Sequence, residues 1–585
     1  DGTRALPDII SSGLAANGSA GFEGDRTRTL AETQDILSSF NWDIGPDEKS
    51  VDPNFSLGTT IGNNYVFDND SVLGFLATVS YSNEWTVAEE MLGNDIGGGQ
   101  ENPRFTKYRD MVSTEQNVRW SGMFNVGYEY NSNHKVELVN MILHDMRDRV
   151  RDGYYFDESE SNPGVEEFRR MDIIFEEREM VSSQLKGTHN FLNLLDGVFF
   201  DWYVGTSRAS REAPDIMEVT FQQFYDESGA LELERLDDTP GTNLNRQYQV
   251  LYDESDTYGF NVSTAFFGDG YDVELKAGMD YYDKTRDGNN IDLAVRHFGI
   301  SSDFKEGSRL NEIFSQENIY NDDFYTSSTG RSVFQDNTGA GDKYSAATKL
   351  TAGYFMVDAF FNQKFRVSGG ARYEDFQQVS IPFIEHSDKF ADDTDAIIDS
   401  IYNESDVLPS LAFTYIPSEE MQYRFNISQT LIRPDLRDIS STFFIDPLTE
   451  FLVRGSPSLV ETELTNIDFR WEWYMSQGNN LSVALFYKDM ENPIEMVQFD
   501  GGEGVPQLLT ANGQEGELYG IEFEFLHDLG FIGDNFSNFF VSGNMTLSDS
   551  EVTIGSGDQE SLFSQQAREA YGGTITATIT NDKRR

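Results

Sequence analysis

The side chains that usually perform chemistry are missing or scattered in this sequence of 585 residues. It contains no cysteine, which excludes a disulfide framework, a zinc–thiolate site and a cysteine nucleophile. The six histidines lack the spacing of metal ligands; they are His134, His144, His189, His297, His386 and His527. The acidic segments 156–161, 320–325 and 390–399 could bind calcium, but none has the spacing of a calcium-binding loop. We therefore interpret them as solvated loop surface.

Catalytic sequence motifs are missing as well. The patterns H-E-x-x-H and G-x-S-x-G and the Walker phosphate-binding loop do not occur. The glycine-rich stretch NTGAGDKYS at 337–345 lacks the Lys-Ser/Thr ending of a phosphate-binding loop, which favours a flexible loop. The sequence therefore predicts a protein that is not an enzyme and has no catalytic, cofactor-binding or metal-binding residues.

Composition narrows the remaining classes. The net charge of −57 and the pI near 4.2 argue against a nucleic-acid partner, because phosphate binding requires clustered Lys and Arg. The mean hydropathy is −0.49, and no run of eighteen apolar residues occurs, which excludes membrane-spanning helices. Aromatic residues nevertheless make up 13% of the chain, and Gly is common. This combination does not fit one ordinary soluble domain.

The elements that must position the side chains are long strands. In NIDFRWEWY (466–474), the apolar residues Ile467, Phe469, Trp471 and Trp473 alternate with charged ones. Such alternation recurs in about sixteen segments, many of ten to sixteen residues, which is longer than the roughly five or six residues of an average strand. Strands of this length suit a tilted membrane crossing of about nine to eleven residues.

The connections between these segments alternate in length. Short turns are expected near Asp68, Asn131, Gly268, Asn362, Ser418 and Ser476. Long acidic loops are expected at about 85–115, 150–172, 210–256, 288–346, 378–404, 432–463 and 496–514. This alternation is typical of a transmembrane antiparallel β-barrel with short periplasmic turns and long extracellular loops. We expect the two edge strands, near Asn54 and near Val541, to be unpaired with each other.

The barrel predicts which way each side chain points. The apolar residues of 466–495 should face lipid, while Asp468, Arg470 and Glu472 face the lumen. Aromatic residues near the headgroups should form the lipid-facing girdle, for which we name Trp471, Trp473, Phe523 and Phe525. A soluble core filled by these aromatics is the alternative, but the opposite face is too charged to pack against a second sheet.

Several segments resemble consecutive hairpins of TonB-dependent outer-membrane receptors. They include DVLPSLAFTYIPSEEMQYRFNISQTLIRPDLRDIS (406–440), RGSPSLVETELTNIDFRWEWY (454–474), LSVALFYKDMENPIE (481–495) and GELYGIEFEFLHDLGFI (516–532). Upstream segments are similar in the same order, and DGTRALPD at the start resembles an early extracellular loop. The resemblance covers the chain from about Asp1 to its end.

The resemblance implies a barrel of about 22 strands around an N-terminal plug, with a Ton box that engages the TonB–ExbB–ExbD complex. We expect residues 1–585 to be an incomplete barrel domain of about 16 strands, because neither a plug nor the family's last strands can be recognised. The implied location is the outer membrane of a Gram-negative bacterium, in contact with lipid and lipopolysaccharide.

The implied function is energy-coupled uptake of a scarce or bulky ligand, such as a siderophore, cobalamin or an oligosaccharide. A passive diffusion pore is the alternative, and a surface adhesin or outer-membrane enzyme is a third class. The aromatic residues of the long loops are the candidate ligand contacts, and we name Phe224, Tyr225, Phe443 and Phe444.

Overall fold

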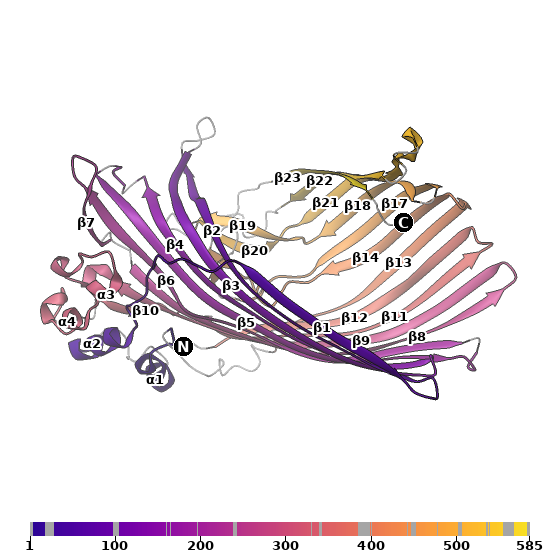
Figure 1. The fold of residues 1–585 in the computed structure, drawn as a ribbon, viewed down its shortest axis with the longest axis horizontal. Coiled ribbons are helices and arrows are strands. Elements are labelled where there is room, and N and C mark those ends of the chain that lie inside the picture. The colour runs from indigo at the N-terminus through magenta and orange to yellow at the C-terminus, as the bar shows by residue number, and fades with distance from the viewer. Residues whose placement is uncertain are drawn as a thin grey trace.

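The molecule is a large curved sheet with helices against one side (Figure 1). The computed structural model describes residues 4–581 except 18–27, 98–103, 159–160, 164, 196, 238–242, 329, 331, 339–341, 384–397, 399, 441–442, 446–451, 477, 501–505, 534–535, 537–538 and 554–566. All statements below refer to these residues.

The wall is a 19-stranded sheet. Two short strands, β7 (Leu231–Leu236) and β10 (Phe334–Asp336), pair with the ends of β6 and β9. The other 17 pair antiparallel in chain order: β1 (Phe55–Val66), β2 (Val72–Gly97), β3 (Arg104–Tyr130), β4 (His134–Asp157), β5 (Glu166–Phe191), β6 (Val198–Tyr225), β8 (Asn243–Gly268), β9 (Tyr271–Arg296), β11 (Lys343–Phe361), β12 (Phe365–Pro382), β13 (Tyr402–Ser418), β14 (Met421–Ile432), β17 (Thr462–Ser476), β18 (Asn479–Glu491), β21 (Glu515–Asp528), β22 (Phe539–Thr553) and β23 (Ala567–Asn581).

This topology confirms the all-β antiparallel class and corrects two details. The series has one strand more than the expected count of about 16. The edge predicted near Val541 is wrong, because Val541 lies in β22 and pairs with Ile579 of β23. The outer strands of the series are therefore β1 and β23.

Strand length divides the wall into two halves. The strands β2 to β6, β8 and β9 have 24–28 residues each. The strands β11 to β14, β17, β18, β21 and β22 have 12–19. At about 3.3 Å per residue, a 26-residue strand is roughly 86 Å long, far more than a membrane crossing needs. The loop predicted at 85–115 is accordingly wrong over most of its length, because β2 and β3 stay paired up to Gly97 and Arg104.

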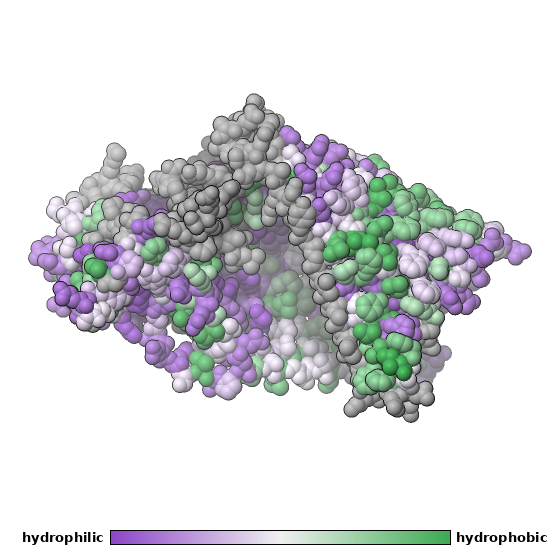
Figure 2. Space-filling model, turned by 90° about the horizontal axis from the view of Figure 1, so that it is seen from above, coloured by the Kyte–Doolittle hydropathy of each residue, from purple (hydrophilic) through white to green (hydrophobic). Residues whose placement is uncertain are grey.

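The alternating residues of each strand form two continuous faces. Phe425, Phe469, Leu485, Ile521 and Leu547 lie opposite one another across five neighbouring strands. Four of these side chains are 40–48% exposed although they are large and apolar. We call the face that carries them the outer face. Hydrophobic residues gather at the right of the space-filling view, where the short turns lie, and hydrophilic residues prevail toward the long loops at the left (Figure 2).

A helical cap covers the loop end of the outer face, where Figure 1 shows the helices on the convex side of the sheet. Its N-terminal part contains α1 (Asp8–Asn17) and α2 (Leu30–Ser39). Thr29 begins α2, because its hydroxyl accepts from the backbone N–H of Glu32 while the Glu32 carboxylate accepts from the N–H of Thr29. The β9–β11 connection adds η1 (His297–Gly299), η2 (Ser302–Phe304), α3 (Leu310–Ile313), α4 (Gln316–Ile319) and η3 (Asp322–Phe324).

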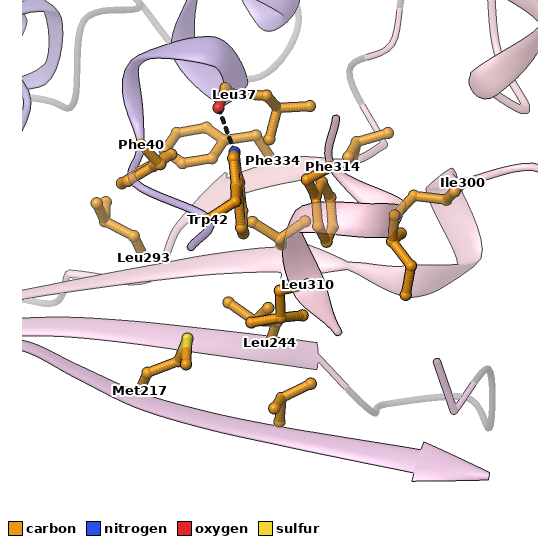
Figure 3. Close-up of a cluster of buried hydrophobic side chains, with 14 of the residues drawn as sticks. Leu37, Phe40, Trp42, Met217, Leu244, Leu293, Ile300, Leu310, Phe314 and Phe334 are labelled. Atoms are coloured by element: carbon orange, nitrogen blue, oxygen red, sulfur yellow. Dashed lines mark hydrogen bonds between the residues drawn. The ribbon is translucent and has the colours of Figure 1, made fainter. Parts of the chain in front are cut away.

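The main hydrophobic core lies between this cap and the wall (Figure 3). Trp42 stacks on Phe314 with 4.0 Å between ring centroids, and its indole N–H donates to the carbonyl of Leu37 at 2.7 Å. Leu244 and Tyr248 of β8 are buried here and share their face with Tyr258 and Phe260 further along the same strand. The cap therefore lies on the outer face, toward the long loops from the exposed apolar residues of that face.

On the inner face, the loops of the short-stranded half pair with each other. The strands β15 (Phe443–Ile445), β16 (Leu452–Arg454), β20 (Pro506–Asn512) and β19 (Ile494–Asp500) form a separate four-stranded sheet, in which β16 and β20 are parallel. Figure 1 shows β19 and β20 on the concave side of the wall. A last short helix, η4 (Leu529–Ile532), follows β21.

Candidate ligand-binding surface on the inner wall

The inner face of β2 to β6 carries a dense network of arginines and carboxylates. Arg147 binds Glu115 at 2.6 Å, and Arg151 binds Glu90 at 3.0 Å. We call this network the arginine wall. Its seven arginines are Arg109, Arg147, Arg149, Arg151, Arg170, Arg178 and Arg211, and its five carboxylates are Glu90, Glu115, Asp172, Glu176 and Glu218. Two positive charges are in excess, in a chain whose net charge is −57.

A groove adjoins the arginine wall toward the short turns. Its volume is about 880 Å³, and its lining includes the side chains of Arg178 and Arg211. Leu143, Met180 and Leu251 add apolar surface to the same lining. The groove therefore combines charged and apolar contacts.

A second charged cluster lies where the long loops of the short-stranded half begin. The guanidinium of Arg433 contacts Glu374 at 2.5 Å, Glu461 at 3.1 Å and Asp406 at 3.5 Å. It also lies 4.4 Å from the ring centroid of Phe376. Burial and the nearby Asp406 carboxylate raise the pKa of Glu461 to about 7.

The same loops are tied to each other by one side chain. The amide of Asn512 donates to the carbonyls of Val460 and Asn492 at 2.9 Å, and its oxygen accepts from the N–H of Val460. Gln378 of β12 donates to the carbonyl of Pro434 at 2.9 Å. The two loops thus form one body that is held against the inner wall.

The structure does not bring the four predicted ligand contacts into one site. Phe224 and Tyr225 are neighbours at the end of β6, so their side chains point to opposite faces. Arg235 of β7 covers Phe224 at 5.0 Å from its ring centroid. Phe443 and Phe444 lie in β15 of the small sheet, and their side chains are outside the described residues. Ligand contact by any of the four stays a prediction.

The predicted girdle residues occupy one face near the short turns. Trp471 and Trp473 lie in β17 with ring centroids 6.5 Å apart, and Phe525 of β21 is 40% exposed. Phe523 lies opposite Val483 and Met545, in line with Trp471. The inner-face partners of this row are polar, as predicted, with Arg470 bound to Glu524 at 2.6 Å. Lipid contact by the girdle stays a prediction.

Sequence reasoning missed one pairing of histidines. His134 and His189 lie opposite each other in β4 and β5, with 3.3 Å between their Nδ1 atoms. Only the register of two long strands reveals this, since 55 residues separate them.

No cluster of three or more His, Cys, Asp or Glu that could hold a metal is found among the described residues. In the same part of the chain, no helix has the length and apolar character that a membrane crossing requires.

Comparison with known protein families identifies the family to which this chain belongs. The family described as TonB dependent receptor-like, beta-barrel matches residues 181–574. The chain therefore belongs to the TonB-dependent receptor family, whose members are β-barrel proteins of the Gram-negative outer membrane and serve as receptors and transporters. A search of curated protein sequences finds no match.

Solved structures of similar shape include receptors for iron carriers. The alcaligin outer-membrane receptor FauA from Bordetella pertussis has 12% identity and a TM-score of 0.40, with 86% of this chain and 62% of that chain covered. The ferric citrate transporter FecA has 9% identity and a TM-score of 0.45, with 86% and 60% covered. The ferric yersiniabactin uptake receptor FyuA from Yersinia pestis has 9% identity and a TM-score of 0.44, with 91% and 73% covered. The chain thus spans less than two thirds of the length of the first two, and nothing about a ligand is transferred from them.

Proposed function

We propose that the intact protein imports a scarce or bulky ligand across the outer membrane, with energy supplied by the TonB–ExbB–ExbD complex. The family match over residues 181–574 carries this proposal. The ligand would be captured from the long-loop side, where the aromatic loop residues and the charged inner wall lie. Siderophores, cobalamin and oligosaccharides are the ligand types that we consider.

The wall is large enough to enclose a channel that a plug could fill. The described series has 17 strands, and barrels of about 16–18 strands already enclose an aqueous channel. A lumen at least this wide would leak unless a plug filled it. Moving a plug against its contacts requires work, which the inner-membrane complex would supply. We expect the intact receptor to contain this plug and a Ton box.

The test uses the complete gene in its host. We would delete the plug and the Ton box and measure ligand uptake in energised cells and in cells whose proton-motive force has been collapsed. Uptake should require both the Ton box and the proton-motive force. Unchanged uptake without either would contradict the proposal and favour the passive diffusion pore.

A further inference from the structure

Arg149 differs from the other members of the arginine wall. It lies on the inner face of β4 between Arg147 and Arg151, and its side chain is half-buried. Its Nε is buried and has no hydrogen-bond partner, and no ion pair within 4.0 Å is found for it in the described part of the chain. A buried N–H of a guanidinium without an acceptor is costly, so the Nε of Arg149 calls for an explanation.

The neighbouring carboxylates do not neutralise Arg149 because other cations hold them. Glu115 lies directly opposite Arg149 in the register, but its carboxylate accepts from Arg147 and Asn117, both at 2.6 Å. Glu90 on the next strand binds Arg151 at 3.0 Å. The carboxylates of Glu115 and Glu90, which lie nearest Arg149 on these two strands, are therefore both engaged by other cations.

The other neighbouring strand gives the same result. Ile174 of β5 lies directly opposite Arg149 and has no acceptor. Glu176 accepts from Arg178 and Arg211, both at 2.5 Å. Asp172 accepts from Arg170 at 3.0 Å and lies 3.9 Å from Arg109. All four carboxylates around Arg149 are thus engaged, and the excess charge of the wall is concentrated on it.

We propose that Arg149 binds a carboxylate or phosphate group of the ligand, so that this receptor takes up an anionic small molecule. This inference rests on the proposed function and specifies its ligand class. A guanidinium presents parallel N–H donors that match a carboxylate or phosphate, and the partly desolvated wall strengthens such a bond. The adjoining groove would hold an apolar part of the same ligand against Leu143, Met180 and Leu251.

The test measures binding to the purified intact receptor in detergent, without any energy source. The probes are citrate, pyrophosphate and the neutral maltotriose, each titrated at low and at high salt. We expect citrate or pyrophosphate to bind in a salt-sensitive manner and maltotriose not to bind. Arg149→Gln should weaken anion binding about tenfold or more, as expected for a lost charge-assisted hydrogen bond.

Two further variants make the result specific. Arg208→Gln is the matched control, because Arg208 lies on the outer face, is exposed and is already paired with Glu254; its affinity should stay within about twofold of the unchanged protein. Arg149→Lys keeps the charge but not the planar fork, so it should bind better than Arg149→Gln and less well than Arg149. It also replaces Arg149→Gln as the informative variant if that protein does not fold.

The inference is overturned if neither anion binds, or if Arg149→Gln, Arg149→Lys and Arg208→Gln bind the anions equally well. Because this assay needs no proton-motive force, its outcome is independent of the uptake experiment. Anion binding without energy-dependent uptake would contradict the proposed function alone.

Discussion

The long-stranded and short-stranded halves of the wall differ in where they bury their loops. The long strands extend beyond the part of the outer face where large apolar side chains are exposed. The helical cap covers the outer face of these extensions. The short strands end early, and their loops fold back onto the inner face as the small sheet around Tyr344, Leu436 and Leu459. A β-wall that extends outside the membrane must therefore cover its apolar surface from one side or the other.

The two halves also use charge differently. The long-stranded half buries one ion pair under its cap, where Arg246 binds Asp215 with 2.6 Å between Nε and Oδ1. The guanidinium of Arg246 also lies 4.4 Å from the ring of Phe40 and 5.0 Å from that of Trp42. The short-stranded half instead gathers three carboxylates around Arg433. The inner loops around Arg433 should therefore respond to pH near neutrality.

The largest effect is expected from breaking the buried pair under the cap. Asp215→Ala would leave Arg246 charged and buried, which should cost about 3–5 kcal/mol of the free energy that holds the cap on the wall. Hydrogen exchange of the amides in α2 measures this cost. Removing both charges in Asp215→Ala/Arg246→Met should restore part of the protection. The exposed pair Arg208–Glu254 serves as the control, and Glu254→Ala should cost less than about 1 kcal/mol.

The next effect tests the assignment of faces in the short-stranded half. Ile521→Arg should cost roughly 2–4 kcal/mol, because it places a charge on the lipid side of a central strand, further from the short turns than the girdle residue Phe523. Glu522→Arg should be nearly neutral, since Glu522 lies opposite Ala484 and Thr546 on the inner face. The measurement is the fraction of heat-resistant folded barrel for each variant. Equal losses would show that the faces are assigned wrongly.

The faces of the strands and the positions of the short turns could be predicted from the sequence. Alternation in 466–474 places Phe469 and Trp471 on one face and Arg470 and Glu472 on the other, and the register agrees. The period of two is a local property, so each strand reports its own faces. The short turns near Asp68 and Asn362 were predictable for the same reason, and both have positive φ residues beside them, Asp70 at 63° and Asn362 at 50°.

The cap and the inner charge clusters could not be predicted because they depend on distant partners. Trp42 contacts Phe314 across 272 positions of sequence, and nothing near either residue announces this stacking. Arg149 is unusual only because Glu115 turns to Arg147, which requires the register of β3 and β4. Polar continuations of β2 and β3 also looked like loops, since paired strands outside a membrane need no apolar face.

The third effect is a pH dependence confined to the short-stranded half. The pKa of Glu461 is about 7 in the folded protein, against 4.5 for an ordinary Glu. Because this folded pKa is raised, the contribution of Glu461 to docking is present below about pH 4.5 and is lost as the pH rises through about 7. At about 1.4 kcal/mol per pKa unit the upper bound of this loss is about 3.5 kcal/mol, and solvent screening of the partly exposed cluster should reduce it to roughly 1–3 kcal/mol. Hydrogen exchange of residues 433–440 between pH 4.5 and 8 measures it.

The variants for this pH effect are chosen on the same cluster. Glu461→Gln should keep the loop docked at all pH values and remove the dependence, since the neutral amide mimics the protonated acid. Glu404→Gln is the control, because Glu404 is exposed on the neighbouring β13. An unchanged pH response in Glu461→Gln would assign the titration to another group.

The smallest effect tests whether the two inner loops move as one body. Asn512→Ala removes three hydrogen bonds to Val460 and Asn492 and should cost about 1–2 kcal/mol of loop docking, because neighbouring backbone and water satisfy part of what is lost. Asn544→Ala on the inner face of β22 should change little, since Asn544 is exposed.

If the small sheet docks as a unit, Asn512→Ala and Glu461→Gln should be coupled by about 0.5 kcal/mol or more in a double-mutant cycle, although the two residues lie on different loops. Additive effects would mean that each loop docks alone. The helical cap and the inner loops would then differ only in the face of the wall that they cover, because both halves would cover their walls with independent segments.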